Sequence, residues 1–164
     1  MKYLLLLCLV VLNSFAAEKS ILENQLHDVT IGMSIDEALI RLPNFIIDKP
    51  VDNNIENCFY LLPNDKNSGM GIMIVDETVV RIDIMDNVNI VTEKGIGIGA
   101  SKQDVINAYP QLMLEPHPYL GQAGEYLESR LPSGDGIIFE TEFDIVRQYR
   151  FGRYPEVQLI EGCL

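Results

Sequence analysis

Apolar and polar residues alternate over much of the chain between residues 57 and 160. The alternating runs are rich in β-branched and aromatic residues, and turn sequences such as PNDKNSG and PSGDG separate them. This pattern predicts antiparallel strands joined by hairpins and meanders. The predicted strands are NCFYLL, GIMIVD, TVVRIDIM, GEYLESRL, GIIFETEF, VRQYRF and EVQLI.

Two short stretches instead have the period of an amphipathic helix. Each begins with a serine that can cap the helix and an acid three residues later, Ser34 with Glu37 and Ser101 with Asp104. Ser34 and Glu37 form a capping-box sequence, and Asp104 makes the second pair a weaker version of it. A proline ends each helix, because the residue before proline avoids helical geometry. The apolar faces and proline stops are Ile35, Ala38, Leu39, Leu42 and Pro43, then Val105, Ile106, Tyr109 and Pro110.

The two predicted helices lie in segments that match each other at a constant shift. VTIGMSIDEALIRLPNF (29–45) aligns with IGIGASKQDVINAYPQL (96–112), and similar strand patterns follow each. Self-similarity of this kind is typical of tandem repeats. We therefore predict an α+β fold of two tandem pseudo-repeats, each a capped helix followed by antiparallel strands that form one continuous or paired sheet. The predicted boundaries are a lead-in at 17–28, a first module at 29–92 and a second at 93–164.

The chain begins with one lysine, an apolar run and small residues, as a secretory signal does. Ser14 and Ala16 fit the positions before a cleavage site, so residues 1–16 are the predicted signal peptide. The run is too short to anchor a protein across a bilayer. Lipidation at Cys8 is the alternative, but LLLLC lacks the small residues that usually precede a lipidated cysteine.

Two cysteines, Cys58 and Cys163, remain after such a cleavage. An even pair in a short exported chain is usually oxidised, which predicts a disulfide between them. Two free thiols or a metal pair are the alternative, and no further metal ligands stand near either cysteine in the sequence.

The chain is strongly acidic, with a formal charge of −12. Removing residues 1–16 takes away one lysine and no acid, so the exported form carries −13. This charge disfavours nucleic acid and anionic membranes, and it attracts basic partners. Solubility alone is the other explanation of the charge. No cofactor is expected.

A glycine-rich stretch, GIGIGASKQDV (95–105), resembles a phosphate-binding loop. A P-loop has Lys followed by Ser or Thr and lies in a parallel sheet, whereas here the order is Ser-Lys and hairpin strands follow. The matching stretch near Gly32 has Asp28 and Thr30 at the positions of Gly95 and Gly97. We therefore interpret the stretch as architecture.

No pattern for catalysis or metal binding stands out in the sequence. His27 and His117 have unlike contexts and lack the local pairing of a zinc site. Ser34 and Ser101 are assigned to helix caps, and no base lies near them in sequence. Two pairs of neighbouring carboxylates fit glycosidase chemistry by residue type, but such pairs also arise by chance among 24 acids. These pairs are Glu140 with Glu142 and Asp83 with Asp86. A non-enzymatic role with no metal site is therefore expected.

The motifs IGMSIDEALIRLP and IGASKQDVINAYP, each followed by strands, resemble the helix-plus-sheet module of the β-lactamase inhibitory proteins. The small outer-membrane lipoprotein of the barrel-assembly machinery has one such module. The resemblance spans residues 29–160 and implies a concave sheet face with loops at its rim. The chain departs from these proteins in having no lipidated cysteine and no tryptophan.

The resemblance implies a binding protein rather than an enzyme. The predicted contact loops are NFIIDKPVDNN (44–54) and LEPHPYLGQAGEY (114–126), and the predicted contact residues are His117, Tyr119, Leu120 and Asp135. We expect a secreted or periplasmic module that binds another exported, basic protein, or binds and inhibits an enzyme such as a cell-wall hydrolase. An envelope-assembly or immunity-type partner protein is one alternative, and a small carboxylate-dependent hydrolase is another.

Overall fold

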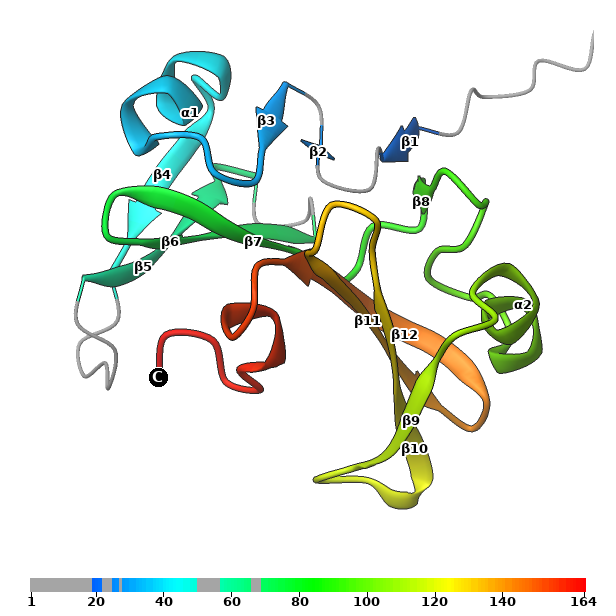
Figure 1. Ribbon diagram of the computed structural model, residues 1–164. Coiled ribbons are helices and arrows are strands. Elements are labelled where there is room, and N and C mark those ends of the chain that lie inside the picture. Colours follow the sequence, from blue (N-terminus) through cyan, green and yellow to red (C-terminus); the bar gives the residue numbers. More distant parts are fainter. Residues whose placement is uncertain (1–18, 22–24, 27, 50–56, 66–68) are drawn as a thin grey trace, which may run out of the picture.

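The structure is a computed structural model that describes residues 19–21, 25–26, 28–49, 57–65 and 69–164. The predicted signal peptide and His27 lie outside these residues. One eight-stranded antiparallel sheet dominates the fold (Figure 1). Its strands are, from edge to edge, β4 (Phe45–Asp48), β5 (Cys58–Pro63), β6 (Met70–Val75), β7 (Thr78–Ile84), β12 (Ile145–Gly152), β11 (Gly136–Glu142), β10 (Gly121–Arg130) and β9 (Met113–His117).

Short elements complete the described part of the fold. They are β1 (Lys19–Ile21) paired in parallel with β8 (Ile90–Thr92), β2 (Gln25–Leu26) paired with β3 (Val29–Thr30), the helices α1 (Ile35–Arg41) and α2 (Lys102–Ala108), and the 3₁₀ turn η2 (Glu156–Gln158). The two helices lie on one side of the bent sheet, and the last residues of the chain lie in its inner angle (Figure 1).

The predicted α+β fold of two tandem helix-plus-sheet repeats is wrong. The described chain is mostly β, and its two helices have seven residues each, about two turns. Strands β7 and β12 pair along Tyr149–Ile84 to Gly152–Arg81, so the hydrogen-bond ladder runs through the middle of the sheet without a break. Short helical periods at two matching places suggested a repeating unit, but the tertiary structure is organised around a single sheet.

Serine caps begin both helices as predicted, but the two caps differ in detail. Ser34 accepts a hydrogen bond from the Glu37 N–H, while the Glu37 carboxylate binds Arg41 at 2.5 Å. In α2 the box is complete, because Asp104 also accepts from the Ser101 N–H at 3.1 Å. The predicted order of strength is therefore reversed, since Arg41 one turn later takes the Glu37 carboxylate away from the cap.

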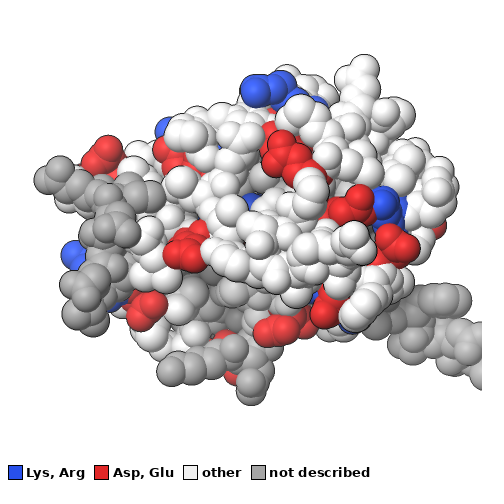
Figure 2. Space-filling view, turned by 90° about the horizontal axis from the view of Figure 1, so that it is seen from below, with Lys and Arg blue, Asp and Glu red and all other residues white. Residues whose placement is uncertain are grey.

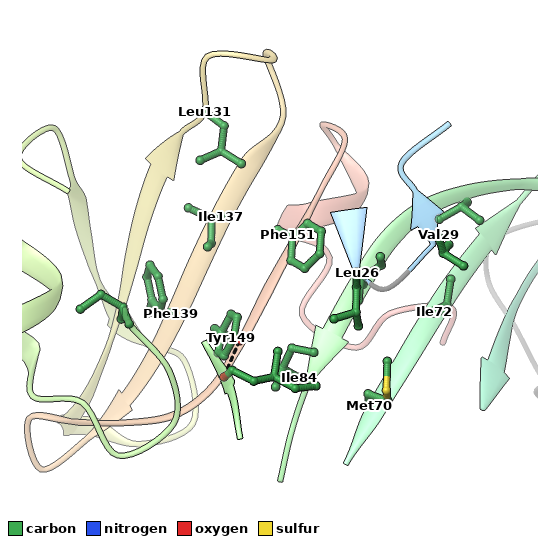
Figure 3. Packing of buried hydrophobic residues seen from close by; sticks show 14 of the residues in the cluster. Leu26, Val29, Met70, Ile72, Ile84, Leu131, Ile137, Phe139, Tyr149 and Phe151 are labelled. Carbon is green, nitrogen blue, oxygen red and sulfur yellow. Dashed lines mark hydrogen bonds between the residues drawn. The ribbon is translucent and has the colours of Figure 1, made fainter. Parts of the chain in front are cut away.

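The main core lies between the sheet and the layer formed by the helices and the N-terminal strands. Phe139, Tyr149 and Phe151 from β11 and β12 lie on the same face as Ile72 and Ile84 from β6 and β7 (Figure 3). Alternate residues of each strand face this side, as the pleat requires. Each fully buried side chain of this size contributes about 1.5–3 kcal/mol.

Three segments differ from their predicted structure. Residues 45–48 and 114–117 were expected in contact loops but belong to the edge strands β4 and β9. Their side chains are largely exposed, so they lack the alternation that marks a half-buried strand. EVQLI was expected to be a strand, but it contains η2 and lies across the inner face of the sheet.

The inner face of the sheet carries buried ion pairs that hold residues 153–164, here called the C-terminal segment. Arg81 Nε donates to Asp83 Oδ2 at 3.1 Å, and Arg81 Nη1 donates to the Leu159 carbonyl at 2.6 Å. Arg150 pairs with Glu140 and donates from Nε to the Val157 carbonyl at 2.6 Å. Burial raises the pKa of the Asp83 carboxyl, and the Arg81 guanidinium opposes this. By their bonds to Leu159 and Val157, Arg81 and Arg150 also satisfy backbone carbonyls of the C-terminal segment that would otherwise be buried unpaired.

A disulfide joins Cys58 to Cys163, with 5.4 Å between the Cα atoms, which confirms the predicted pairing. Both cysteines are buried and pack with Met73 and Val80. The bridge fastens the end of the C-terminal segment to the start of β5.

Tyr149 makes folding sensitive to alkaline pH. Its hydroxyl donates to the Ile90 carbonyl at 2.9 Å inside the core, and burial raises its pKa above the ordinary value of 10.0. The folded state therefore keeps this proton longer than the unfolded chain. The stabilising contribution is complete below pH 10 and is lost as pH rises through the folded-state pKa, by up to about 1.4 kcal/mol per pH unit.

Tyr149→Phe should accordingly flatten the decline of unfolding free energy above about pH 10, as measured by urea denaturation. Tyr60, whose pKa burial also raises, leaves some slope in the variant. Below about pH 9 the two proteins should show parallel profiles. Profiles that stay parallel above pH 10 as well would contradict this assignment.

Candidate functional site

One end of the sheet exposes a group of large apolar side chains, here called the turn surface: Tyr119, Leu120 and Phe143. Tyr119 and Leu120 lie in the turn between β9 and β10, and Phe143 lies in the turn between β11 and β12. The Phe143 N–H donates to the Ala123 carbonyl at 2.7 Å, which brings the two turns together. Tyr119 is 66% exposed and Phe143 71% exposed.

Phe143 has a backbone conformation that is unusual for a bulky residue. Phe143 and Asp144 have φ angles of 50° and 60°, the left-handed geometry of a type I′ hairpin turn. Asn, Asp and Gly favour such positions, and a large side chain there is an outlier. The turn between β6 and β7 has the same geometry with polar residues, Asp76 and Glu77. The turn alone therefore does not require an exposed aromatic residue, and strained, exposed residues of this kind often mark functional sites.

Tyr119 is oriented by two hydrogen bonds. Its hydroxyl donates to Glu161 Oε1 at 2.5 Å, and its backbone N–H donates to His117 Nδ1 at 3.2 Å. The bond to the Glu161 carboxylate raises the pKa of the Tyr119 hydroxyl. The C-terminal segment, which contains Glu161, thus helps to position the turn surface.

His117 lies beneath this surface and is mostly buried, not in an exposed loop as expected. Its Nε2 is 3.4 Å from Glu140 Oε2, and the ring packs edge-on against Tyr126 at 4.8 Å between centroids. Because Nδ1 accepts the Tyr119 N–H, the hydrogen of a neutral ring lies on Nε2, facing Glu140. Both ring nitrogens are therefore engaged within the protein.

A shallow pocket of about 230 Å³ opens beside His117 and Leu120. Its carboxylates are already paired: Glu140 with Arg150, and Glu142 with Arg147 at 3.3 Å. Glu140 also accepts from Gln148 Nε2 at 2.6 Å. Within the described ranges, no three His, Cys, Asp or Glu side chains gather as metal ligands. These pairings favour structural roles for both carboxylates.

Asp135 lies far from the other predicted contact residues. It occupies the turn between β10 and β11, where it accepts from the Ser133 hydroxyl at 2.9 Å. Strand β10 runs its whole length between this turn and the turn of Tyr119, roughly 30 Å at the usual rise per residue. The structure therefore brings together His117, Tyr119 and Leu120 but not Asp135.

Phe143 was not among the contact residues identified from sequence. It ended the predicted strand GIIFETEF, so it was interpreted as part of the sheet. A possible signal was the Asp that follows it, a typical turn residue standing between two β-rich runs.

Two carboxylates stand next to this region. Glu142 precedes Phe143 in the chain, and Glu161 accepts a hydrogen bond from the Tyr119 hydroxyl. Seen from below, the molecule shows carboxylates scattered across its face, with fewer basic groups between them (Figure 2).

No known protein-family model matches the sequence, and no curated protein matches it. Solved structures do match the fold. The uncharacterised protein YfeY from Escherichia coli superposes with a TM-score of 0.55 at 16% identity, over 82% of this chain and 99% of that one. An extracellular protein containing a SCP domain from Bacillus anthracis superposes with a TM-score of 0.53 at 9% identity, over 85% of this chain. The chain corresponds to half the length of that structure.

At these identities the matches establish the fold alone. The YfeY match agrees with the mostly β sheet and not with tandem helix-plus-sheet repeats. The resemblance to β-lactamase inhibitory proteins is not tested by these matches and stays a prediction.

The bridge and the matches are compatible with export. Disulfides persist in oxidising compartments, and the B. anthracis protein is described as extracellular. Among the described residues, no helix has the length and apolar character needed to cross a membrane.

Proposed function

We propose that this protein is an exported protein-binding module that contacts its partner through the turn surface. The observation that carries the proposal is Phe143, a 71% exposed aromatic residue in a left-handed turn at the same end of the sheet as the exposed Tyr119. Aromatic side chains are enriched among the residues that dominate binding energy. Tyr119 is already oriented by Glu161 and His117, so ordering it on binding costs little entropy.

The charge of the chain favours a basic partner. A net charge of −12, with Glu161 in contact with the turn surface, would raise the rate of encounter with a basic protein. A secreted or periplasmic location, where disulfides form, offers basic exported enzymes such as cell-wall hydrolases, and binding at their active sites would inhibit them.

The test is a binding and inhibition assay against lysozymes and a class A β-lactamase at near-physiological ionic strength. Phe143→Ser and Tyr119→Ser should each weaken binding by about tenfold or more. Ile40→Ser is the matched control, because Ile40 is 80% exposed but lies on α1. It should leave affinity within about twofold.

Two results would count against the proposal. One is equal weakening by Ile40→Ser, which indicates non-specific apolar contact. The other is that none of the enzymes tested forms a stoichiometric complex with the protein.

A further inference from the structure

Among the described strands, β4 forms one edge of the sheet. Within the described part of the chain it pairs with β5 alone, and it has the sequence FIID. Ile46 and Ile47 are each 47% exposed. An open edge of this kind presents backbone groups to which another strand can bind.

The register shows which backbone groups face outward. The Asn64 N–H donates to the Asn44 carbonyl at 2.8 Å, so these residues form a hydrogen-bonded pair. Hydrogen-bonded and non-hydrogen-bonded pairs alternate along an antiparallel ladder. The pair Ile47–Leu61 is therefore non-hydrogen-bonded. The N–H and C=O of Ile47 point away from β5, toward the free edge.

The other edge of the sheet is protected. Strand β9 contains Pro116, which has no N–H to donate, and its ladder with β10 shifts register between Gly121 and Glu125. Proline and bulges are common devices against strand addition. Strand β4 has neither device within its four residues.

A groove of about 790 Å³ lies against the same edge. Ile47, Phe59 and Leu39 provide its apolar surface, and the volume is in the range of ligand sites. Among the described residues, three carboxylates also line it, those of Asp36, Asp76 and Glu77, and one ammonium group, that of Lys49. The Lys49 Nζ lies 5.2 Å above the Phe59 ring.

We propose that β4 is a strand-addition site for an extended segment of another protein in which apolar and basic residues alternate. Backbone pairing at Ile47 would supply affinity, as in other cases of strand addition. Side chains on alternate positions of the added strand would face the groove, where an apolar residue meets Ile47 at the edge. A long Lys or Arg side chain would extend along the groove, past Phe59, toward the carboxylates of Asp76 and Glu77. This site lies at the opposite edge of the sheet from β9 and β10, so it does not depend on the proposed turn surface.

The test is an array of octapeptides that alternate Val, Ile, Leu or Phe with Lys or Arg, beside the same peptides with Glu or Ser in place of the basic residues. Affinities of the best binders would be measured by fluorescence anisotropy. Basic members should bind one to one, and acidic or neutral members should bind at least about tenfold more weakly. N-methylation of alternate amides of a basic binder should abolish its binding, because strand pairing needs those N–H groups.

Variants of the protein locate the site. Glu77→Lys should weaken binding of the basic peptides at least about fivefold. Ile47→Pro should weaken it by a similar factor, because proline removes the outward-facing N–H of residue 47 and no hydrogen bond to β5. Glu115→Lys makes the same charge change on the exposed edge strand β9 and should have little effect. Circular dichroism shows whether each variant is folded. If Ile47→Pro does not fold, Glu77→Lys alone locates the site.

Several outcomes would overturn the proposal. The first is that no basic peptide binds. The second is that Glu77→Lys and Glu115→Lys lose equal amounts of peptide affinity. The third is that the N-methylated peptide binds as tightly as the unmodified one. A dimer in sedimentation that Ile47→Pro dissociates would also overturn it, because a second copy would then be the occupant. Phe143→Ser should leave peptide binding unchanged, so failure here and failure of the turn surface are distinguishable.

Discussion

Replacing Arg150 with methionine is expected to destabilise the protein by about 3–5 kcal/mol. The change leaves Glu140 buried without its guanidinium, and it also removes the bond from Arg150 Nε to the Val157 carbonyl. A loss of this size is a large part of the 5–15 kcal/mol typical of a domain. Urea denaturation followed by circular dichroism gives the free energy of unfolding.

The matched control lies on the same strand. Arg147 pairs with Glu142 at 3.3 Å, but its side chain is 54% exposed. Arg147→Met should change stability by only about 0–1 kcal/mol, because exposed ion pairs are screened by water. If the two variants are equally stable, the Arg150 pair does not behave as a buried one.

The double variant Arg150→Met, Glu140→Gln should recover part of the lost stability. It removes the unpaired charge, and the Arg150 Nη2 atom has no hydrogen-bond partner among the described residues. Removing both charges of a buried pair often costs less than removing one. A double variant less stable than the single one would show that Glu140 is held chiefly by Gln148 and His117.

Loss of the Cys58–Cys163 disulfide should destabilise the protein by about 4–5 kcal/mol in the chain-entropy model. The bridge spans 105 residues, so it strongly restricts the unfolded chain. The oxidised protein, the reduced protein and Cys58→Ala, Cys163→Ala would be compared by urea denaturation. A melting temperature that does not fall on reduction would contradict this prediction.

The bridge should also affect the turn surface. Cys163 stands two residues from Glu161, whose carboxylate holds the Tyr119 hydroxyl. Reduction should therefore loosen the Tyr119 ring, which NMR line shapes can follow. Tyr149, which lies in the main core and bonds to the Ile90 carbonyl, is the internal reference and should change less.

Local chemistry made several features predictable from sequence. Ser34 and Ser101 cap their helices because a hydroxyl at that position reaches an N–H in the next turn. Pro43 and Pro110 follow the helix ends because proline restricts the residue before it. The central strands showed as β-rich runs between turn residues, and the two cysteines outside the predicted signal peptide allow one bridge.

Long-range pairing was not predictable in this way. Whether β7 pairs with β12 depends on hydrogen bonds between residues more than sixty positions apart, which no local period records. The edge strands β4 and β9 are exposed and lack alternation, so only their partners define them as strands. The matching helix motifs therefore suggested two tandem helix-plus-sheet repeats, whereas the described chain is mostly β, with one eight-stranded sheet and two short helices.

The same distinction between local sequence and long-range pairing applies to the candidate site. The sequence by itself determined which residues were available: Tyr119 and Leu120 between β-rich runs, a strongly acidic chain and one cysteine pair. Only the tertiary structure decided that His117 is mostly buried against Glu140, that Asp135 lies at the far end of β10, and that Phe143 is exposed at the same end of the sheet as Tyr119. These outcomes depend on strand register and hairpin twist, which are settled by packing of the whole sheet rather than by neighbouring residues.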